Sequence, residues 1–285
     1  MGTMGVSSWL LEHQMSAHSG KTAIVTGAST GIGRASAEAL AQAGFTVFGT
    51  SRRPTGYGPN QVSMLTCNVT DDESVNALVS TVLAETGRVD VLVNNAGIGL
   101  LGGAEESSIS QVQALFDVNL FGVMRVTNAV LPSMRRRGQG RIINISSVLG
   151  LLPAPYSAHY SATKHALEGY SESLDHEIRA FNIRVSLIEP AYTRSVFEQN
   201  ALEPDSRLKE YDQSRAGARA LVRDVMTTAD PPEVVADAVL QAATAARPLR
   251  RYTAGKVARQ VSVLRRFAPA GIFDKSLRKQ MRLPA

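Results

Sequence analysis

Short apolar runs, rich in β-branched residues, alternate with longer amphipathic stretches along the first 190 residues. The runs predict strands at residues 22–25, 46–48, 62–69, 89–93, 141–145 and 184–188. The stretches between them predict helices at residues 33–43, 70–86, 109–136 and 158–181. Strands that alternate with helices of this length imply βαβ units, and therefore a parallel sheet with helices on both faces.

The helix that begins near residue 70 carries a recognisable start signal. Thr70 and Glu73 have the spacing of a capping box, and Val75 and Leu78 begin an apolar face behind it. Gly87 is expected to end the helix. This segment therefore separates two strands clearly.

The pattern as a whole predicts an α/β fold: a single-domain, doubly wound (Rossmann-type), mostly parallel sheet with helices on both faces and a helical C-terminal extension. Residues 1–20 are expected to be a flexible leader, and residues 21–285 one domain. Residues 196–285 are helix-rich and interrupted by prolines, which suggests a lid over the carboxyl ends of the strands. Segments 150–157 and 196–225 are expected to line a substrate pocket.

Composition narrows the class of protein. Apolar residues at 44% and charged residues at 19% of 285 are ordinary for a soluble globular protein. The one cysteine, Cys67, excludes an internal disulfide and favours a buried core thiol in a cytoplasmic protein. The five histidines lack metal-ligand spacing, so no metal site is expected.

Charge is unevenly distributed. The net charge is +5, but residues 247–285 hold eleven Lys or Arg and one acid, so this tail is +10 and the remainder −5. Solvated basic helix faces are the favoured explanation, and no nucleic-acid-binding spacing is present. Val257, Val261, Leu264 and Phe267 recur at helical spacing among cations. Packing of this face on the domain or on a partner subunit is favoured over contact with a membrane surface.

The first motif with chemical meaning is a glycine-rich turn between the first strand and the first helix. Glycines let the backbone approach a pyrophosphate closely, where free N–H groups and the positive helix end bind the charge. An ordinary glycine turn is the alternative. The motif reads TGASTGIG from Thr26, and its candidate cofactor-binding residues are Gly27, Ser29, Thr30, Gly31, Ile32 and Gly33.

The end of the second strand indicates which dinucleotide binds. An NAD site usually has an acidic residue there, whereas an NADP site needs cations for the 2′-phosphate. Ser51 occupies the acid position, and Arg52 and Arg53 follow it. NADP(H) is therefore the expected cofactor, with NAD(H) less favoured.

A third motif pairs a phenol with an ammonium. Tyr160 and Lys164 are four residues apart, so they share one face of the predicted helix. The Lys164 charge favours ionisation of Tyr160, which a tyrosine acting as an acid/base at neutral pH requires. A surface pair is the alternative.

Polar residues also follow other strands. Asn95, Ala96 and Gly97 come after the fourth strand, Ser147 follows the fifth, and Asn119 lies in the long helical stretch. Because strand ends meet at one rim of such a fold, these residues should form one site.

With these motifs the chain resembles the short-chain dehydrogenase/reductase family over about residues 20–195. The resemblance implies that Tyr160 is the general acid/base, that Lys164 lowers its pKa and holds the nicotinamide ribose, and that Ser147 binds the substrate oxygen. It implies a proton relay through Asn119. It also implies cofactor contacts from Asn68, Val69, Asn95, Ala96, Gly97, Pro190, Thr193 and Ser195.

Two positions depart from the family pattern. Asn68 stands where the family often has Asp, and Ala191 replaces the usual glycine after Pro190. Neither is expected to abolish cofactor binding. A narrower resemblance, to the 17β-hydroxysteroid and retinol dehydrogenase branch, suggests a bulky apolar substrate.

The expected function is thus an NADP(H)-dependent oxidoreductase that interconverts an alcohol and a ketone or aldehyde as a homodimer or homotetramer. The alternatives are a non-catalytic NADP(H)-binding sensor or scaffold, and a different reaction on the same fold. The filled catalytic positions disfavour the first. Lys at position 164 and the intact glycine motif disfavour the second, since a dehalogenating relative would lack both.

Overall fold

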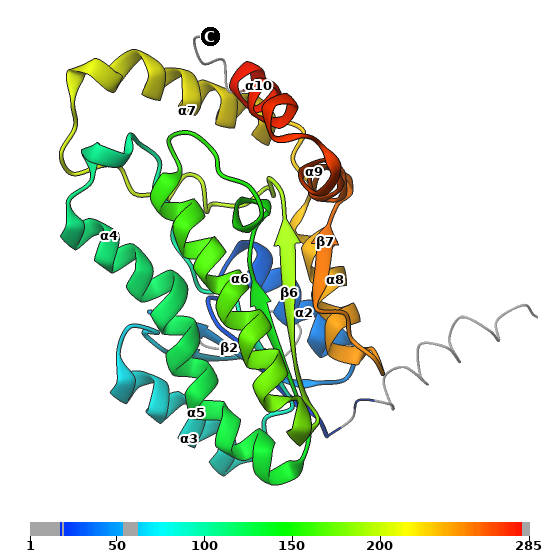
Figure 1. Cartoon of the computed structure of the whole chain (residues 1–285). Coiled ribbons are helices and arrows are strands. Elements are labelled where there is room, and N and C mark those ends of the chain that lie inside the picture. Colours follow the sequence, from blue (N-terminus) through cyan, green and yellow to red (C-terminus); the bar gives the residue numbers. More distant parts are fainter. Residues whose placement is uncertain (1–17, 19, 54–61, 281–285) are drawn as a thin grey trace, which may run out of the picture.

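The seven strands form one parallel sheet in the order β3-β2-β1-β4-β5-β6-β7 (Figure 1). This computed structural model describes residue 18 and residues 20–53 and 62–280. The order reverses between β1 and β4, where a doubly wound sheet opens a crevice at its carboxyl edge. The predicted fold class is confirmed. The strands are β1 (Thr22–Val25), β2 (Thr46–Ser51), β3 (Ser63–Thr66), β4 (Val91–Asn94), β5 (Gly140–Ile145), β6 (Ile183–Pro190) and β7 (Arg251–Ala254).

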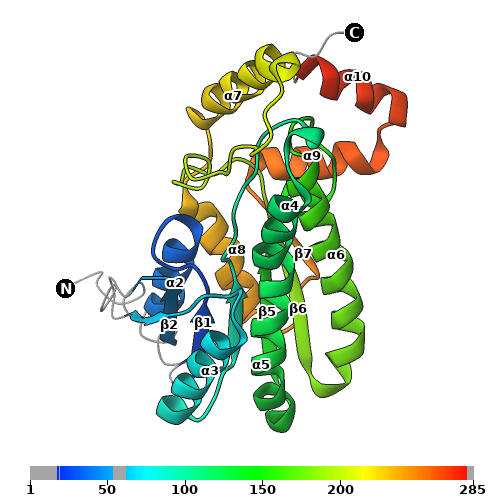
Figure 2. The same cartoon turned by 90° about the vertical axis from the view of Figure 1, so that its left-hand side faces the viewer.

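Alternate residues of the strands bury against helices on opposite faces (Figure 2). Val25 and Val93 pack with α2 (Gly31–Gln42) and α8 (Pro232–Thr244). Ile24 and Leu92 pack on the other side, with helices α3 (Asp72–Thr86), α5 (Gly122–Arg137) and α6 (Ala158–Ile178). Because both faces are covered, the strands are apolar throughout, which is why they were recognisable in the sequence.

The start of α3 corrects one prediction. Asp71 is the capping residue, and its carboxylate accepts the Glu73 backbone N–H. Thr70 instead donates its hydroxyl to the Asn68 side chain. Asp and Thr are both good caps, so the capping-box spacing was misleading by one residue. Gly87 ends the helix as expected, with a φ of 71°.

The long stretch after residue 109 is helical but not uniform. Helix α4 (Ile109–Phe116) continues through a π-helical turn, Asp117–Phe121, into α5. By length and composition this stretch could cross a membrane, but Val126, Val130 and Met134 are buried in the core under the sheet. It is therefore a core helix of this fold.

Three helices of the C-terminal third lie above the carboxyl edge of the sheet (Figures 1 and 2), while α8 covers one face and β7 extends the sheet. This third contributes α7 (Asp212–Met226), α9 (Lys256–Phe267), α10 (Ala270–Gln280) and the edge strand β7. The seventh strand was not predicted. Its four residues, RYTA, begin with an arginine and carry only a weak strand signal.

Helix α9 exposes much of the apolar face that was expected to be covered. Ala258 is buried, but Val257, Leu264 and Phe267 are 51%, 44% and 73% exposed. This face is therefore only partly covered by its own domain, and packing on a partner subunit stays a prediction. The predicted leader, apart from His18 and Gly20, lies outside the described residues.

Candidate active site

A cavity of about 1230 Å³ opens at the carboxyl ends of the strands. It brings together the glycine turn, the end of β2 and the residues after β4, β5 and β6. Of the predicted site residues, all but Gly33 and Asn119 line it. The lining includes Gly27, Ser29, Thr30, Gly31, Ile32, Ser51, Arg52, Arg53, Asn68, Val69, Asn95, Ala96, Gly97, Ser147, Tyr160, Lys164, Pro190, Thr193 and Ser195.

The glycine turn is tightly packed. Gly27 and Gly31 have φ of 66° and 54°, a conformation that side-chain-bearing residues rarely adopt. A Cβ on Gly33 would lie 2.2 Å from the Gly27 carbonyl oxygen. Asn95 braces the same turn by donating to the carbonyls of Thr26 and Gly27 at 2.9 and 3.0 Å. Gly33 and the side chain of Asn95 therefore maintain the conformation of the turn.

The N-terminus of α2 offers free hydrogen-bond donors to the cavity. Thr30 is the N-cap but makes no side-chain capping bond, and no acidic residue lies in the first turn. Uncapped N–H groups at the positive end of a helix suit a pyrophosphate. The turn thus fits a dinucleotide.

Cations gather at the end of β2. Arg52 and Arg53 are exposed at the cavity, and the Ser51 hydroxyl accepts the Arg53 backbone N–H at 3.3 Å. Asn68 lines the neighbouring wall, where its side-chain oxygen accepts from Thr70. Among the described residues no carboxylate lines the cavity at this strand end, so the residues present fit a phosphorylated ribose.

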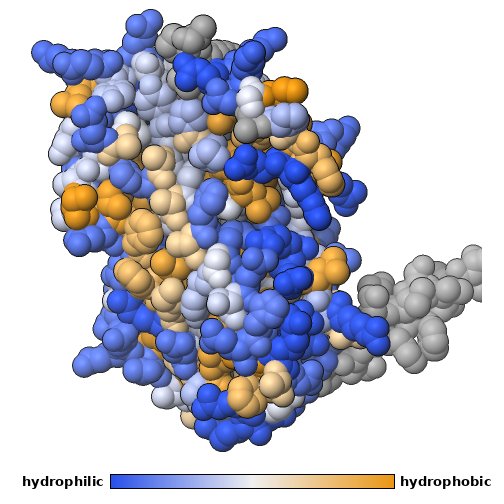
Figure 3. Space-filling view, viewed as in Figure 1, coloured by the Kyte–Doolittle hydropathy of each residue, from blue (hydrophilic) through white to orange (hydrophobic). Residues whose placement is uncertain are grey.

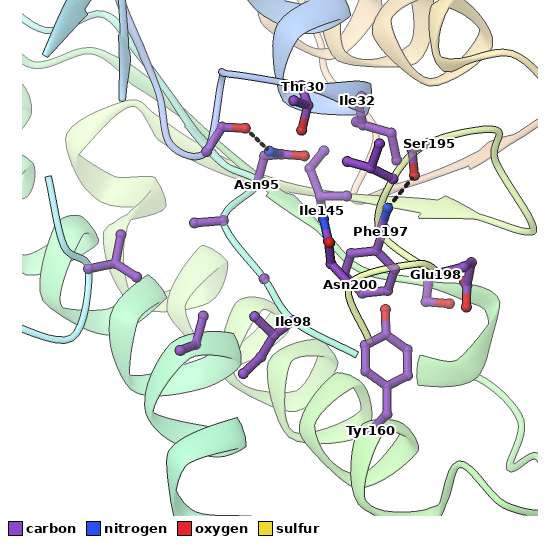
Figure 4. A pocket seen from close by; sticks show the side chains of 18 of the residues that line it. Thr30, Ile32, Asn95, Ile98, Ile145, Tyr160, Ser195, Phe197, Glu198 and Asn200 are labelled. Atoms are coloured by element: carbon purple, nitrogen blue, oxygen red, sulfur yellow. Dashed lines mark hydrogen bonds between the residues drawn. The ribbon is translucent and has the colours of Figure 1, made fainter. Parts of the chain in front are cut away.

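Tyr160 and Lys164 lie on one face of α6, as predicted. The Tyr160 ring points into the cavity (Figure 4), and its hydroxyl is hydrogen-bonded to Ser147. Lys164 lies beneath it, with Nζ 5.6 Å from the Tyr160 ring centre. Nζ also donates to the Ile145 carbonyl at 2.9 Å, which holds the ammonium in place.

Burial dominates the electrostatics of this pair. It raises the pKa of Tyr160 above its usual value; the nearby Glu198 charge raises it further, and the Ser147 bond opposes both. Burial lowers the pKa of Lys164 to about 8, against the effect of Glu168. Burial thus raises the pKa of Tyr160 in the chain alone, and the lowering by Lys164 that the family resemblance implies stays a prediction.

Asn119 lies behind the cavity, in the π-helical turn. Its side-chain oxygen accepts the Ile98 N–H at 2.9 Å, and its amide donates to the Ile98 carbonyl at 2.9 Å and to Thr163 Oγ1 at 3.2 Å. These bonds fix the segment after β4 against α6. In the described structure Asn119 thus braces the cavity wall.

The substrate end of the cavity differs from expectation. Segment 150–157 does not line it, and of segment 196–225 only residues up to Leu202 do. The lining residues outside the predicted site residues and segments are Thr50, Cys67, Thr70, Ile98, Ala114, Asp117, Val118, Ile145, Ser146, Val148, Leu149, Ala191 and Tyr192. Val196, Phe197, Glu198, Asn200 and Leu202 are the residues of the expected segment 196–225 that line the cavity. Nothing in residue type marks these positions, because which side of the lid loop faces inward depends on its folded path.

The family can now be assigned. A family model described as short chain dehydrogenase matches residues 21–206. The chain belongs to the short-chain dehydrogenase/reductase family. Retinol dehydrogenase 8 of Bos taurus is 37% identical to this dehydrogenase over 258 residues, covering 82% of the chain and 81% of the relative. The 3-ketodihydrosphingosine reductase of Bacteroides thetaiotaomicron is 43% identical over 177 residues, covering 62% of the chain and 65% of the relative's length.

Solved structures agree with this assignment. A short-chain dehydrogenase from Streptomyces avermitilis has a TM-score of 0.77 and 35% identity, covering 92% of this chain and 95% of its own. A Burkholderia phymatum relative in complex with NAD has a TM-score of 0.76 and 26% identity, covering 87% and 93%. A metagenomic one in complex with NADP has a TM-score of 0.65 and 29% identity, covering 82% and 96%. The chain is therefore an oxidoreductase, and its fold is that of proteins that bind nicotinamide dinucleotides.

Proposed function

We propose that this dehydrogenase is an NADP(H)-dependent reductase of ketones or aldehydes that also catalyses the reverse oxidation of the alcohol. The observation that carries the proposal is the Tyr160–Ser147 pair, held in one cavity with the uncapped end of α2 and with Arg52. Acid chemistry and dinucleotide binding thereby meet in a single site.

The dinucleotide, when bound, supplies the hydride. Tyr160 then donates its phenolic proton to the developing alkoxide, while Ser147 donates a hydrogen bond to the same oxygen. Lys164, anchored on Ile145, keeps a positive charge beside Tyr160 as the phenolate forms. Reduction requires Tyr160 in its protonated form, which burial favours.

A bulky apolar substrate is supported by the walls of the cavity beyond Tyr160. Ile98, Val148, Leu149, Phe197 and Leu202 surround this end. Relatives named for retinol and for a keto-sphingoid substrate point the same way. We therefore propose a steroid-, retinoid- or lipid-like substrate.

The first prediction tests the cofactor. Arg52→Ala should weaken NADPH binding roughly tenfold to hundredfold, the cost of a charged hydrogen bond, and leave NADH binding unchanged. Fluorescence titration measures both, followed by a carbonyl panel spanning steroids, retinal and aliphatic aldehydes. Arg34→Ala is the control, since Arg34 pairs with Glu38 outside the cavity. Equal losses for both cofactors would show that Arg52 does not read the 2′-phosphate.

The competing function is a non-catalytic NADP(H)-binding sensor or scaffold. It would be supported if the folded protein bound NADPH tightly yet oxidised it with no carbonyl of the panel. The filled acid, base and oxyanion positions argue against it.

We also propose a cytoplasmic homo-oligomer, dimer or tetramer, formed through α4, α5 and α6. Ile109 of α4, Phe121 in the π-helical turn before α5 and Phe181 in the short turn after α6 expose apolar surface, at 73%, 46% and 42%.

We also propose that the exposed face of α9 binds an anionic membrane. The exposed apolar residues of α9 lie beside the cations of a tail with a net charge of +10. A second copy of this basic face would be repelled, whereas anionic lipid offers both apolar and charge complementarity.

A further inference from the structure

Glu198 places a carboxylate at the reacting end of the cavity. It belongs to the loop after β6 and lines the same cavity as Ser147 and Tyr160. In Figure 4 its side chain lies beside the hydroxyl end of Tyr160. Its charge acts on both Tyr160 and Tyr192 and raises the pKa of each. The carboxylate is therefore within electrostatic reach of the atoms that react.

The described residues supply no partner for this charge. The Glu198 carboxylate has no hydrogen bond and no ion pair among them, and burial raises the pKa of its carboxyl. Other charges that line the cavity are Arg52 and Arg53 at the ribose end, Lys164, and Asp117, which is paired with Arg125. Lys164 points away, to the Ile145 carbonyl. A half-buried carboxylate without a partner is costly and favours binding of a cation.

The polar groups that line this end of the cavity, such as Tyr160, Tyr192 and Asn200, carry no positive charge, so a ligand is the source of a cationic partner. A carboxylate or phosphate near the reacting carbon would be repelled. An ammonium would form a charge-assisted hydrogen bond, which is stronger than one from a neutral hydroxyl.

We propose that Glu198 is a specificity-determining residue that binds an ammonium group adjacent to the reacting carbon, so that the substrate is an apolar amino ketone and the product an amino alcohol. The inference rests on the proposed function. The carbonyl carbon gains the hydride, its oxygen gains the Tyr160 proton, and the ammonium is unchanged. The apolar chain occupies the space between Val148 and Leu202.

The test compares a long-chain α-amino ketone with the ketone of equal length that lacks the amine. The wild-type enzyme should prefer the amino ketone in kcat/KM. Glu198→Gln should lower kcat/KM for the amino ketone roughly tenfold to hundredfold more than for the plain ketone, with the difference mainly in KM. Glu198→Asp should restore part of the preference. Glu210→Gln, an exposed residue outside the cavity, is the matched control.

Three outcomes would overturn the assignment. The first is a wild-type enzyme that does not discriminate between the two ketones. The second is an equal loss for both in Glu198→Gln. The third is a change in the ratio of NADP⁺ to NADPH affinity in that variant, which would assign the carboxylate to the positive nicotinamide ring.

A binding measurement separates this inference from the proposed function. Calorimetry with the long-chain amino alcohol and the matched alcohol, with NADP⁺ present, needs no turnover. If no ketone is reduced but the amine still binds tenfold or more tightly in a Glu198-dependent way, the reaction is wrong and the amine site stands. Equal binding of both alcohols would overturn the amine site and leave the proposed reaction untouched.

Discussion

Tyr160 and Lys164 respond to burial in opposite directions. Removal from water disfavours the charged form of each, so the pKa of the phenol rises and that of the ammonium falls to about 8. The sequence predicted their common face on α6 but not this balance. The interaction of the Lys164 charge with Tyr160 follows from their spacing along the helix. Their desolvation depends on Phe197 and Glu198, which belong to the lid loop and line the same cavity.

Tyr160→Phe should therefore remove the acid and little else. We expect kcat to fall by about 10² to 10⁴-fold, the usual contribution of general acid catalysis, with the NADPH dissociation constant unchanged. Steady-state kinetics and fluorescence titration measure the two quantities. Tyr170→Phe is the control, because Tyr170 is on the same helix but outside the cavity. A folded Phe variant that loses NADPH binding would contradict the role.

At the scale of elements, one buried ion pair attaches the lid to the domain. Glu106 accepts the backbone N–H groups of Gly103 and Leu208 at 2.7 and 3.0 Å and pairs with Arg215 of α7. Both side chains are almost fully buried, at 0% and 5% exposed. These hydrogen bonds and the Arg215 charge outweigh burial and hold the pKa of Glu106 below its usual value. The contribution is thus present at neutral pH and lost as pH falls through the lowered pKa.

Arg215→Met should leave the Glu106 charge buried and unpaired. The free energy of unfolding in urea should fall by about 3 kcal/mol, and KM should rise because the lid loosens. Arg219→Met removes a half-exposed pair with Glu203 one turn further along α7, and should cost less than about 1 kcal/mol. Equal effects of the two variants would contradict a role for the buried pair.

The sequence predicted the elements with strong local signals and missed those that depend on tertiary packing. Six strands were recognised because they are buried on both faces and are therefore apolar throughout. Four helical stretches were recognised because each covers the sheet with one apolar face. Strand β7 was missed because its Arg251 is held by ion pairs to Glu168 and Glu172 on α6, which no local pattern reveals. The π-helical turn was missed for the same reason, since the bonds of Asn119 reach across the fold.

At the scale of the whole molecule, the helices at the C-terminal end present both apolar and cationic side chains at the surface. Helix α9 is attached to the domain by Ala258 and by Arg265, whose Nε donates to the Leu151 carbonyl at 3.2 Å. Hydrophobic side chains nevertheless reach the surface over α9 and α10 among hydrophilic ones (Figure 3). A fixed helix that presents apolar and cationic side chains outward suits the boundary between lipid headgroups and acyl chains.

The protein should therefore float with vesicles that contain phosphatidylserine at low salt, and not with pure phosphatidylcholine vesicles. High salt should release most of it, because the electrostatic attraction is screened. Leu264→Ser with Phe267→Ser should reduce retention at least roughly tenfold, since each removes apolar area that is buried only in lipid. Leu249→Ser, which removes an exposed apolar residue outside α9, should change nothing. Wild-type protein that stays at the bottom of the gradient at low salt would show that this face has another partner.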